Sequence, residues 1–439
     1  MLTVNIVSLG CSKNLVDSER LLKCLHDSGC EIMFDASPEQ LEKKCPDPRN
    51  RIVIVNTCGF ISDAKEESIN TLLEWGSLRT AGHISRLICM GCLSERYRKE
   101  LPDMIPEVDS WHGKHDWAEI VGELVKNRPA MMTYDRIITT PRHHAYLKIA
   151  EGCNRFCAFC AIPLITGRYH SRPIEEIENE VKELVKRGVR EFNVIAQDLS
   201  HYGTDLYGKS ALAELVDRLA DIEGVEWIRL HYAYPADFPL DVLDVMARRD
   251  NVCKYLDIAL QHISDNVLEN MRRHITSRQT RELLAEMRRR VPGLHIRTTL
   301  MVGFPGEGEK EFQELLDFVK EQKFERMGAF AYCEEDDTYA ALNLDDQIPQ
   351  DVKQKRLDTL MALQEEISLQ HQLEKVGMEL DVVIDREDND YYIGRTQWDS
   401  PEVDPEVLIK KTRPCKRGDV IRVKITEALP FELIAVPVV

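Results

Sequence analysis

The sequence lacks the long apolar segments and the leader that would direct a protein into or across a membrane. No run of residues approaches the roughly 18 apolar positions that a membrane-spanning helix needs. At the N-terminus, Met1–Asn5 shows no basic segment ahead of an apolar stretch, as a secretory signal would. We therefore expect a soluble protein of the cytoplasm with no membrane partner.

An excess of basic residues is also missing. The 439 residues include 57 Lys and Arg against 75 Asp and Glu, a formal net charge of −18, which argues against a generally basic nucleic-acid-binding protein. The sequence has neither a phosphate-binding P-loop nor a recognisable Ser/His/Asp set. With 43% hydrophobic and 30% charged residues, its composition is that of an ordinary globular protein, and its length suggests two to four domains.

Nothing in the sequence indicates a disulfide framework. The chain has 13 cysteines, an odd number, and no secretory signal accompanies them. Such a pattern is typical of reduced thiols, some of which bind metal.

Residues 1–118 have the pattern of an α/β domain. The segment 36–50 is polar and interrupted by prolines, which predicts a surface loop, and a linker is expected at about 119–140. Three short apolar runs predict strands at Val4–Leu9, Ile52–Val55 and Leu87–Met90.

Residues 139–370 alternate between predicted strands and helices, which favours six βα units on a parallel sheet, a (β/α)6 partial barrel. Residues 373–439 contain five short strands and predict a small closed β-barrel of OB-like type. The six central strands are expected at Ala145–Ala150, Glu191–Ala196, Glu226–His231, Tyr255–Leu260, His295–Val302 and Arg326–Tyr332.

The strongest chemical signal is a C-x3-C-x2-C run directly after the first central strand. We call Cys153, Cys157 and Cys160 the central cysteine set. Three thiolates at this spacing can hold three irons of a 4Fe–4S cluster and leave the fourth iron open for a ligand. A structural zinc site fits less well, because it needs a fourth ligand, for which His170 is the candidate.

Three further cysteines each follow one of the apolar runs of the N-terminal domain. We call Cys11, Cys58 and Cys92 the N-terminal cysteine set. If the three strands are parallel, these cysteines gather at the carboxyl edge of the sheet, where ligands bind in open α/β folds. The pattern predicts a second three-thiolate site with an open iron; the alternative is that each thiol is a small buried residue that caps a strand.

Polar residues at the central strands are candidates for contacts to a cofactor. Gln197 and Gln261 fall at strand ends that face the mouth of the partial barrel, and Arg297 lies within the fifth strand. Each could equally be an ordinary strand cap. We expect His143 and His144, which precede the first central strand, to be surface residues.

The central cysteine set at the first strand of a six-unit βα repeat resembles a radical SAM domain. The N-terminal domain adds the elements Gly-Cys-x-x-Asn (Gly10–Asn14), Asp-Ser-Glu (Asp17–Glu19), Asn-Thr-Cys (Asn56–Cys58) and Gly-Cys (Gly91–Cys92). This arrangement, with a terminal β-barrel, resembles the radical SAM methylthiotransferases over essentially the whole chain. The barrel would then be their TRAM domain, a substrate-recognition module.

Within that family, several stretches resemble the branch that modifies an aspartate of small-subunit ribosomal protein twelve; the other branch modifies an adenosine in tRNA. Leu373–Val439 carries 14 Asp and Glu against 10 Lys and Arg, a net charge of −4 that favours a basic protein partner over tRNA. A basic cluster keeps the tRNA alternative open and could contact ribosomal RNA. The stretches are Cys11–Glu19, Tyr146–Cys153, Ala196–Asp198, Leu260–Asp265 and Gly394–Asp404; the cluster is Lys410, Lys411, Arg413, Lys416 and Arg417.

The resemblance implies the cofactors and the reaction. Both cysteine sets would hold 4Fe–4S clusters, the central one would bind S-adenosylmethionine, and Phe159 would pack against its adenine. Two S-adenosylmethionine molecules would serve, one to methylate a sulfur and one to supply a radical that removes a hydrogen from the β-carbon of the target aspartate. The substrate would be ribosomal protein twelve, free or in the ribosome, and the electron donor a flavodoxin or ferredoxin.

Two other classes of protein remain as alternatives, a non-catalytic iron–sulfur electron carrier and a zinc-stabilised RNA-binding module. The sequence also departs from the family pattern at two places. The segment 36–50 resembles an insertion, and Thr166 precedes Gly167 where the family often has Arg.

Overall fold

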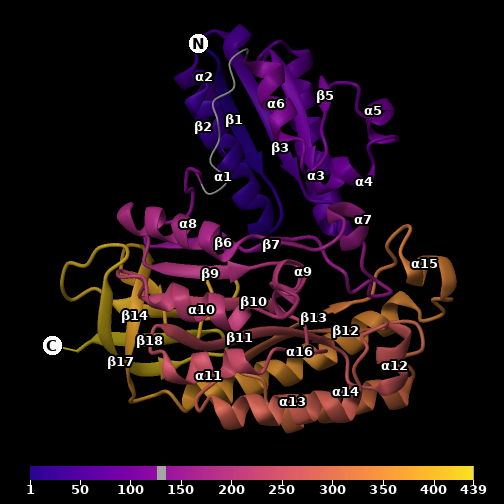
Figure 1. Cartoon of the computed structure of the whole chain (residues 1–439), viewed down its shortest axis with the longest axis vertical. Coiled ribbons are helices and arrows are strands. Elements are labelled where there is room, and N and C mark those ends of the chain that lie inside the picture. The colour runs from indigo at the N-terminus through magenta and orange to yellow at the C-terminus, as the bar shows by residue number, and fades with distance from the viewer. Residues whose placement is uncertain (126–134, 439) are drawn as a thin grey trace. The chain divides into compact units, whose positions relative to one another are not determined.

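The computed structural model describes residues 1–125 and 135–438, which form two compact units (Figure 1). Unit 1 comprises Met1–Thr139, Glu151–Asn154 and Ala161–His170, and unit 2 comprises Thr140–Ala150, Arg155–Cys160 and Ser171–Val439. Each unit is described by itself below. Within the described residues, no helix is both long enough and apolar enough to cross a membrane.

Unit 1 is built on a parallel sheet of five strands in the order β2-β1-β3-β4-β5. The three predicted strands are β1, β3 and β4, and the sequence analysis missed the two edge strands because β2 is half-buried and β5 has only two residues. The strands are β1 (Thr3–Ser8), β2 (Glu31–Phe34), β3 (Arg51–Thr57), β4 (Arg86–Gly91) and β5 (Ser110–Trp111). The helices are α1 (Ser12–Asp27), α2 (Pro38–Lys44), α3 (Ser62–Thr80), α4 (Cys92–Arg96), α5 (Leu101–Met104), α6 (Trp117–Leu124) and α7 (Ile162–Thr166).

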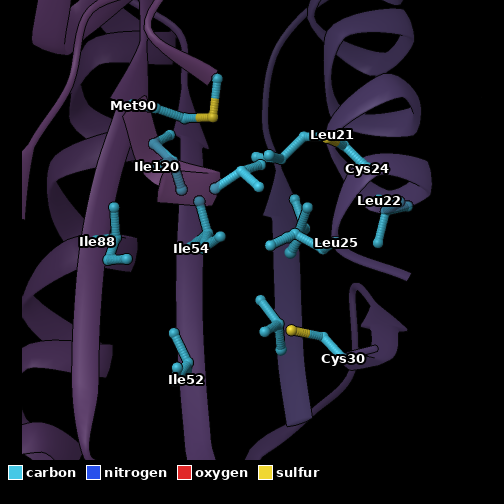
Figure 2. Close-up of a cluster of buried hydrophobic side chains, with 13 residues drawn as sticks. Leu21, Leu22, Cys24, Leu25, Cys30, Ile52, Ile54, Ile88, Met90 and Ile120 are labelled. Carbon is cyan, nitrogen blue, oxygen red and sulfur yellow. The ribbon is translucent and has the colours of Figure 1, made fainter. Parts of the chain in front are cut away.

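Both faces of this sheet are apolar, as expected for a parallel sheet covered by helices on each side. On one face, Ile52, Ile54 and Ile88 pack against α1 and α6. Cys24 and Cys30 lie in this cluster beside leucines of α1 (Figure 2). Both thiols are therefore core residues of unit 1.

The segment 36–50 is not the surface loop that its composition predicts. It contains the helix α2, where Ser37 and Gln40 form a capping box, and a single 3-10 turn, Pro48–Asn50. Leu41 is buried against the sheet. The expectation was wrong because proline is well tolerated in the first turn of a helix, so Pro38 begins a helix rather than excluding one.

The linker expected at about 119–140 begins inside α6, which buries Ile120 and Val121 in the core of unit 1. Part of the predicted linker, residues 126–134, lies outside the described residues. Beyond it, Glu19 of α1 accepts hydrogen bonds from the amide of Thr139 (2.7 Å) and pairs with Arg136. The described end of the segment is therefore anchored to unit 1.

Unit 2 contains the predicted six-stranded parallel sheet, in the order β13-β12-β11-β10-β9-β6. Each strand lies beside the next strand of this repeat along the chain, as in a partial (β/α) barrel, so the expected (β/α)6 pattern is confirmed. The strands are β6 (His144–Lys148), β9 (Glu191–Ile195), β10 (Trp227–Ala233), β11 (Val252–Gln261), β12 (His295–Val302) and β13 (Arg326–Ala331). The main helices are α8 (Ile174–Lys186), α10 (Leu212–Ala220), α11 (Asp241–Arg248), α13 (Ser277–Arg290), α14 (Glu309–Gln322) and α16 (Gln350–Leu373).

Short elements complete the chain between these helices and strands. They are β7 (Ala150–Glu151), β8 (His170–Ser171), the 3-10 turn Leu199–His201, α9 (Thr204–Tyr207), α12 (Asp265–Asn270) and α15 (Tyr339–Asn343).

The C-terminal strands of unit 2 close into the predicted five-stranded barrel, in the order β14-β15-β16-β18-β17. Alternate residues such as Val382, Ile384, Ile409 and Val423 point inward and form its core. The strands are β14 (Glu379–Glu387), β15 (Tyr391–Arg395), β16 (Glu406–Lys410), β17 (Val420–Ala428) and β18 (Glu432–Pro437).

The barrel and the six-stranded sheet are joined by buried ion pairs at the amino ends of the central strands. Arg395 of β15 donates two hydrogen bonds to Glu191 (3.0 and 2.8 Å), the first residue of β9, and Glu191 also pairs with Arg229. Although burial would raise it, the pKa of Glu191 is held far below its usual value by Arg395 and Arg229. Two further contacts follow, from Arg326 to Asp399 (3.1 Å) and from Tyr255 to Asp404 (2.7 Å).

His143 and His144 are buried in this interface, so the expectation of surface histidines was wrong. The cause is the barrel: Nε2 of His143 donates to Oδ1 of Asp385, 2.8 Å away in β14. Burial lowers the pKa of His144 to about 4. His143, His144 and Asp385 place ligand atoms within 4.8 Å of one another, but both Asp385 oxygens already accept hydrogen bonds, from His143 and Arg395. Asp385 is therefore engaged by His143 and Arg395, whereas Nδ1 of His144 is buried without a hydrogen-bond partner among the described residues.

Candidate functional site

The N-terminal cysteine set lies at the carboxyl edge of the sheet of unit 1. Cys58 directly follows β3, Cys92 directly follows β4, and Cys11 follows β1 by three residues. The three strands are adjacent and parallel, with Ser8 opposite Asn56 and Thr57 opposite Gly91. The sheet therefore brings together three cysteines that are far apart in the sequence.

Two glycines allow the loops that carry these cysteines to approach one another. Gly10 has a φ of +87°, and a Cβ at this position would lie 2.7 Å from the Cβ of Cys58 and 3.0 Å from its sulfur. Gly91 has a φ of +103°, and its Cβ would lie 2.4 Å from the side-chain oxygen of Asn56. Only glycine suits both the backbone conformation and the space at these positions.

Asn14 connects the ends of all three strands. Its amide nitrogen donates to the carbonyl oxygens of Leu9 (3.2 Å) and Thr57 (3.0 Å), and its amide oxygen accepts from the thiol of Cys92 (3.4 Å). The Gly-Cys-x-x-Asn element of the sequence thus has a structural role in unit 1, because it fixes the loops on which the cysteines lie.

A buried lysine, Lys114, faces the same edge and was missed by the sequence analysis. Its ammonium donates to Asn14 (3.2 Å) and Asp17 (2.9 Å), and its side chain is 2% exposed. Burial would lower the pKa of Lys114, but the charges of Asp17, Glu151 and Cys92 raise it well above its usual value. The site therefore holds a permanent positive charge. Nothing in the sequence signals it, because Lys114 is a single lysine in a loop and belongs to no motif.

The three thiols differ in acidity. Burial raises the pKa of Cys92 to about 12, against the opposing charge of Lys114, and burial also raises the pKa of Cys58. Desolvation would raise the pKa of Cys11 as well, but the charges of Lys13 and Lys114 lower it. Each thiol influences another electrostatically, so the set forms one site at which a metal would have to displace protons.

The central cysteine set lies on the loop after β6. In unit 2, the amide of Cys160 donates to the carbonyl of Cys157 (3.0 Å), and Cys157 packs against Tyr234 and Ala236. Phe159, between them in the sequence, is partly buried and lies edge-on to Phe304, with ring centroids 6.2 Å apart.

Cys153 belongs to the segment Glu151–Asn154, which is grouped with unit 1. Its amide donates to the carbonyl of Gly167 (3.2 Å), next to α7. Gly152 has a φ of +86°, and a Cβ there would lie 2.1 Å from the carbonyl oxygen of Arg168. The glycine before Cys153 is thus required by a close backbone approach.

Arg273, a second charged residue that the sequence analysis missed, lies beside the central cysteine set in unit 2. It is buried, and its Nη1 donates to the sulfur of Cys157 (3.3 Å). In the sequence it follows Arg272 in a strongly charged stretch, which gives no sign that one of the two arginines is buried.

The predicted cofactor contacts fall into two groups. Gln261 ends β11 with a φ of +69°, and Gln197 follows β9 by two residues, so both lie at the carboxyl edge of the six-stranded sheet. Arg297 lies near the amino end of β12, where its guanidinium faces Asp257 and Asp404, at 3.3 Å each. The structure therefore brings Gln197 and Gln261 to the edge that carries Cys157 and places Arg297 against the barrel.

The residues present fit the cofactors that these patterns suggest. Two sets of three soft thiol ligands suit iron–sulfur clusters. The side-chain oxygen of Gln261 is buried and has no hydrogen-bond partner among the described residues, which is costly unless a ligand supplies a donor. An amino or hydroxyl group of S-adenosylmethionine would satisfy this oxygen.

Comparison with known families and structures identifies the class of the protein. Residues 147–319 match the Radical SAM superfamily, residues 376–438 match the TRAM domain, and residues 3–113 match an uncharacterized protein family, UPF0004. The fold is similar to that of the radical S-adenosylmethionine methyltransferase TsrM from Kitasatospora setae, at 15% identity and a TM-score of 0.57 over 75% of this chain and 74% of that chain. It is also similar to the cobalamin-dependent S-adenosylmethionine radical enzyme OxsB, at 13% identity and a TM-score of 0.53 over 83% of this chain and 62% of that chain. The chain is a radical SAM enzyme with a C-terminal TRAM barrel.

Curated relatives define the family more closely. A protein of Parabacteroides distasonis named ribosomal protein uS12 methylthiotransferase RimO is 56% identical over 430 residues, which cover 98% of each chain. Proteins of the same name are 55% identical in Phocaeicola vulgatus (99% of this chain, 98% of the other) and 54% identical in Bacteroides fragilis (98% of each). The chain belongs to the RimO family and is a radical SAM methylthiotransferase, so the predicted family and enzyme class are confirmed.

Proposed function

We propose that this protein transfers a methylthio group to the β-carbon of a specific aspartate in small-subunit ribosomal protein uS12. The observation that carries the proposal is identity of 53–56% to several RimO relatives over 98–99% of the chain. Similarity of this extent includes the barrel and both cysteine sets. It favours a shared substrate as well as shared chemistry.

We assign two 4Fe–4S clusters to the two cysteine sets. The N-terminal set is Cys11, Cys58 and Cys92, supported by the convergence of three strand ends around Asn14 and Lys114. The central set is Cys153, Cys157 and Cys160, supported by its spacing and by its position after the first strand of a radical SAM fold.

S-adenosylmethionine would bind at the carboxyl edge of the six-stranded sheet. Phe159, Gln197 and Gln261 are the proposed contacts there, and the unsatisfied oxygen of Gln261 is the best support. Arg297 is proposed as a cofactor contact from the sequence alone. Its guanidinium pairs with Asp257 and Asp404 near the barrel, so no contact among the described residues supports this role. When bound, the N-terminal cluster would hold the sulfur that is transferred. One S-adenosylmethionine would supply its methyl group, and a second, with the central cluster, would supply the one-electron chemistry that an unactivated C–H bond requires.

We divide the protein into three functional domains: an N-terminal methylthiotransferase domain at residues 1–118, a radical SAM domain at 139–370 and a TRAM domain at 373–439. The barrel, with a net charge of −4, is the proposed docking site for the basic substrate, uS12. Free uS12 and the assembled ribosome are both compatible with this surface. A flavodoxin or ferredoxin is the proposed electron donor, and a ribosomal substrate implies a cytoplasmic location.

One feature favours a second candidate, methylthiolation of an adenosine in tRNA. An open cavity of about 660 Å³ lies between the start of β6 and the β16–β17 loop of the barrel. Its walls are rich in arginine, which suits phosphate groups of RNA. The same cavity could contact ribosomal RNA if uS12 is modified within the ribosome. The charged residues that line it are Arg142, Arg190, Arg413 and Arg417, with Glu226 and Asp419.

Mass spectrometry separates these candidates. Ribosomal protein uS12 and tRNA nucleosides would be compared between cells with the gene, cells without it and deleted cells that carry a Cys157→Ala copy. We expect the methylthio increment on the uS12 aspartate to disappear in the last two strains, while tRNA nucleosides stay unchanged. Loss of a methylthioadenosine with unchanged uS12 would contradict the proposal and establish the tRNA branch.

A further inference from the structure

Arg273 is the charged side chain that touches Cys157 in unit 2. It follows α12 and is 3% exposed. Its Nη1 donates to the sulfur of Cys157 at 3.3 Å, and its Nη2 donates to the carbonyl oxygen of Ala259 in β11. The guanidinium is thus fixed between the cysteine loop and a strand of the sheet.

Tyr234 holds this arginine in place. Its ring centroid lies 4.1 Å from the guanidinium carbon of Arg273, and its hydroxyl donates to the carbonyl oxygen of Arg273 (2.8 Å). The same hydroxyl lies 3.8 Å from the sulfur of Cys157. The orientation of Arg273 towards the sulfur is therefore built by several contacts rather than by one flexible side chain.

Arg273 and the other arginine on the Tyr234 ring differ in whether a carboxylate neutralises their charge. Arg155 lies 4.2 Å from the ring centroid, but its guanidinium pairs with Asp198 at 2.6 Å. In the described part of the chain, the partners of Arg273 are a sulfur, a carbonyl and an aromatic ring, and none is a carboxylate. The positive charge of Arg273 is therefore directed at Cys157 without a neutralising anion.

A buried positive charge of this kind affects electron transfer. Arginine stays protonated in proteins, so the charge is permanent. The reduction potential of an iron–sulfur cluster depends on hydrogen bonds to its sulfur ligands and on the net charge around it. One added electron makes the cluster and its thiolates more negative, and a fixed cation at a ligand sulfur stabilises that reduced state.

We propose that Arg273 is a positioning residue that acts through the Cys157 ligand to raise the reduction potential of the central cluster. The inference rests on the proposed function, in which Cys157 binds iron. The step concerned is the transfer of one electron from a low-potential flavoprotein or ferredoxin to the cluster. No bond forms or breaks in it, and no proton moves.

The experiment measures the potential of the central cluster alone. A background protein carrying Cys11→Ala, Cys58→Ala and Cys92→Ala would hold a single cluster, which is titrated with dithionite and followed by electron paramagnetic resonance. Arg273→Gln removes the charge in this background. We expect the one-electron equilibrium constant for reduction to fall at least tenfold, a shift of about 59 mV to more negative potential.

Two matched variants accompany it. Arg272→Gln removes the neighbouring arginine, which is exposed and lies over the ring of Tyr339, and should change the constant less than twofold. Arg273→Lys keeps the charge but loses the planar fork that bonds both the sulfur and the Ala259 carbonyl. Its constant should lie between those of the background and Arg273→Gln, at least threefold below the background.

The outcomes separate this inference from the ligand assignment. An unchanged potential in Arg273→Gln, with full iron content, would overturn the role of Arg273. If Arg273→Gln does not hold iron, Arg273→Lys decides in the same way. If the background protein holds no cluster, or keeps it after Cys157→Ala, the ligand assignment itself is wrong.

Discussion

The two parallel sheets of this chain carry their cysteines in different ways. In unit 1, three neighbouring strands contribute one cysteine each, and the site exists only when β1, β3 and β4 pair in register. In the central set, all three cysteines come from one loop of eight residues after β6. A site of the first kind depends on the whole sheet, whereas a site of the second kind is encoded locally.

The surroundings of the two sheets also differ. The sheet of unit 1 is covered by apolar clusters on both faces. The amino edge of the six-stranded sheet is polar, and Glu191, Arg229 and Arg326 bind residues of the barrel there. In unit 2 the barrel occupies the amino edge of the six-stranded sheet. Ligands would therefore bind at the carboxyl edge, where Gln261 and Cys157 lie.

The largest expected effects come from the cysteines. Both Cys58→Ser and Cys157→Ser should abolish methylthiolation of uS12, because each proposed cluster is needed. Each should reduce the iron content by about half, since each set holds one four-iron cluster. Only Cys157→Ser should also abolish the cleavage of S-adenosylmethionine on reduction. Iron analysis and chromatography of the cleavage products check these expectations.

A control and a contrary result define this test. Cys89→Ala alters a fully buried thiol in β4, three residues before Cys92, and the variant should keep its iron, because the side chain of Cys89 packs in the apolar core of unit 1. Full iron content in Cys58→Ser, or loss of iron in Cys89→Ala, would show that the N-terminal set is assigned wrongly.

The same comparison explains what the sequence could predict. Most strands follow from apolar runs, and the central cysteine set follows from the spacing of Cys153, Cys157 and Cys160, whereas the N-terminal set required the further assumption that three strands are parallel. The burial of His143 and His144 could not be predicted, because it depends on Asp385, about 240 residues later in the barrel. Likewise, the roles of Lys114 and Arg273 arise from contacts with residues that are distant in the sequence, and no local pattern marks them.

The second prediction concerns the buried ion pairs of the two units. Glu191→Gln leaves the buried guanidinium of Arg229 without its carboxylate and leaves that of Arg395 paired with Asp385 alone, whereas Glu19→Gln in unit 1 affects one guanidinium, that of Arg136. Removing one partner of a buried pair costs about 3–5 kcal/mol. We expect Glu191→Gln to lower the free energy of unfolding by this amount and Glu19→Gln to lower it less. Urea denaturation followed by circular dichroism measures both.

Proteolysis shows where the damage lies. Glu191→Gln should release the barrel, so that limited trypsin digestion cuts near residue 375 faster than in the unmodified protein. Glu19→Gln should leave this cleavage unchanged. Equal cleavage in the two variants would mean that the ion pairs do not hold the barrel on the sheet.

The smallest effect is a dependence of stability on pH that comes from unit 2. Burial holds His144 neutral, with a pKa of about 4 in the folded state against about 6.5 when unfolded. As the pH falls from 6.5 towards 4, the unfolded chain binds a proton that the folded chain does not, so the folded state loses stability. The loss at pH 5, relative to pH 7.5, is about 2 kcal/mol. His144→Gln should reduce the loss of stability at pH 5 by about 2 kcal/mol. His83→Gln, which changes an exposed histidine of unit 1, should leave the loss unchanged. Urea denaturation at the two pH values gives the loss of stability for each protein, and the contributions of carboxylates common to all three proteins cancel. If His144→Gln lost as much stability at pH 5 as the unmodified protein, His144 would be charged in the folded protein.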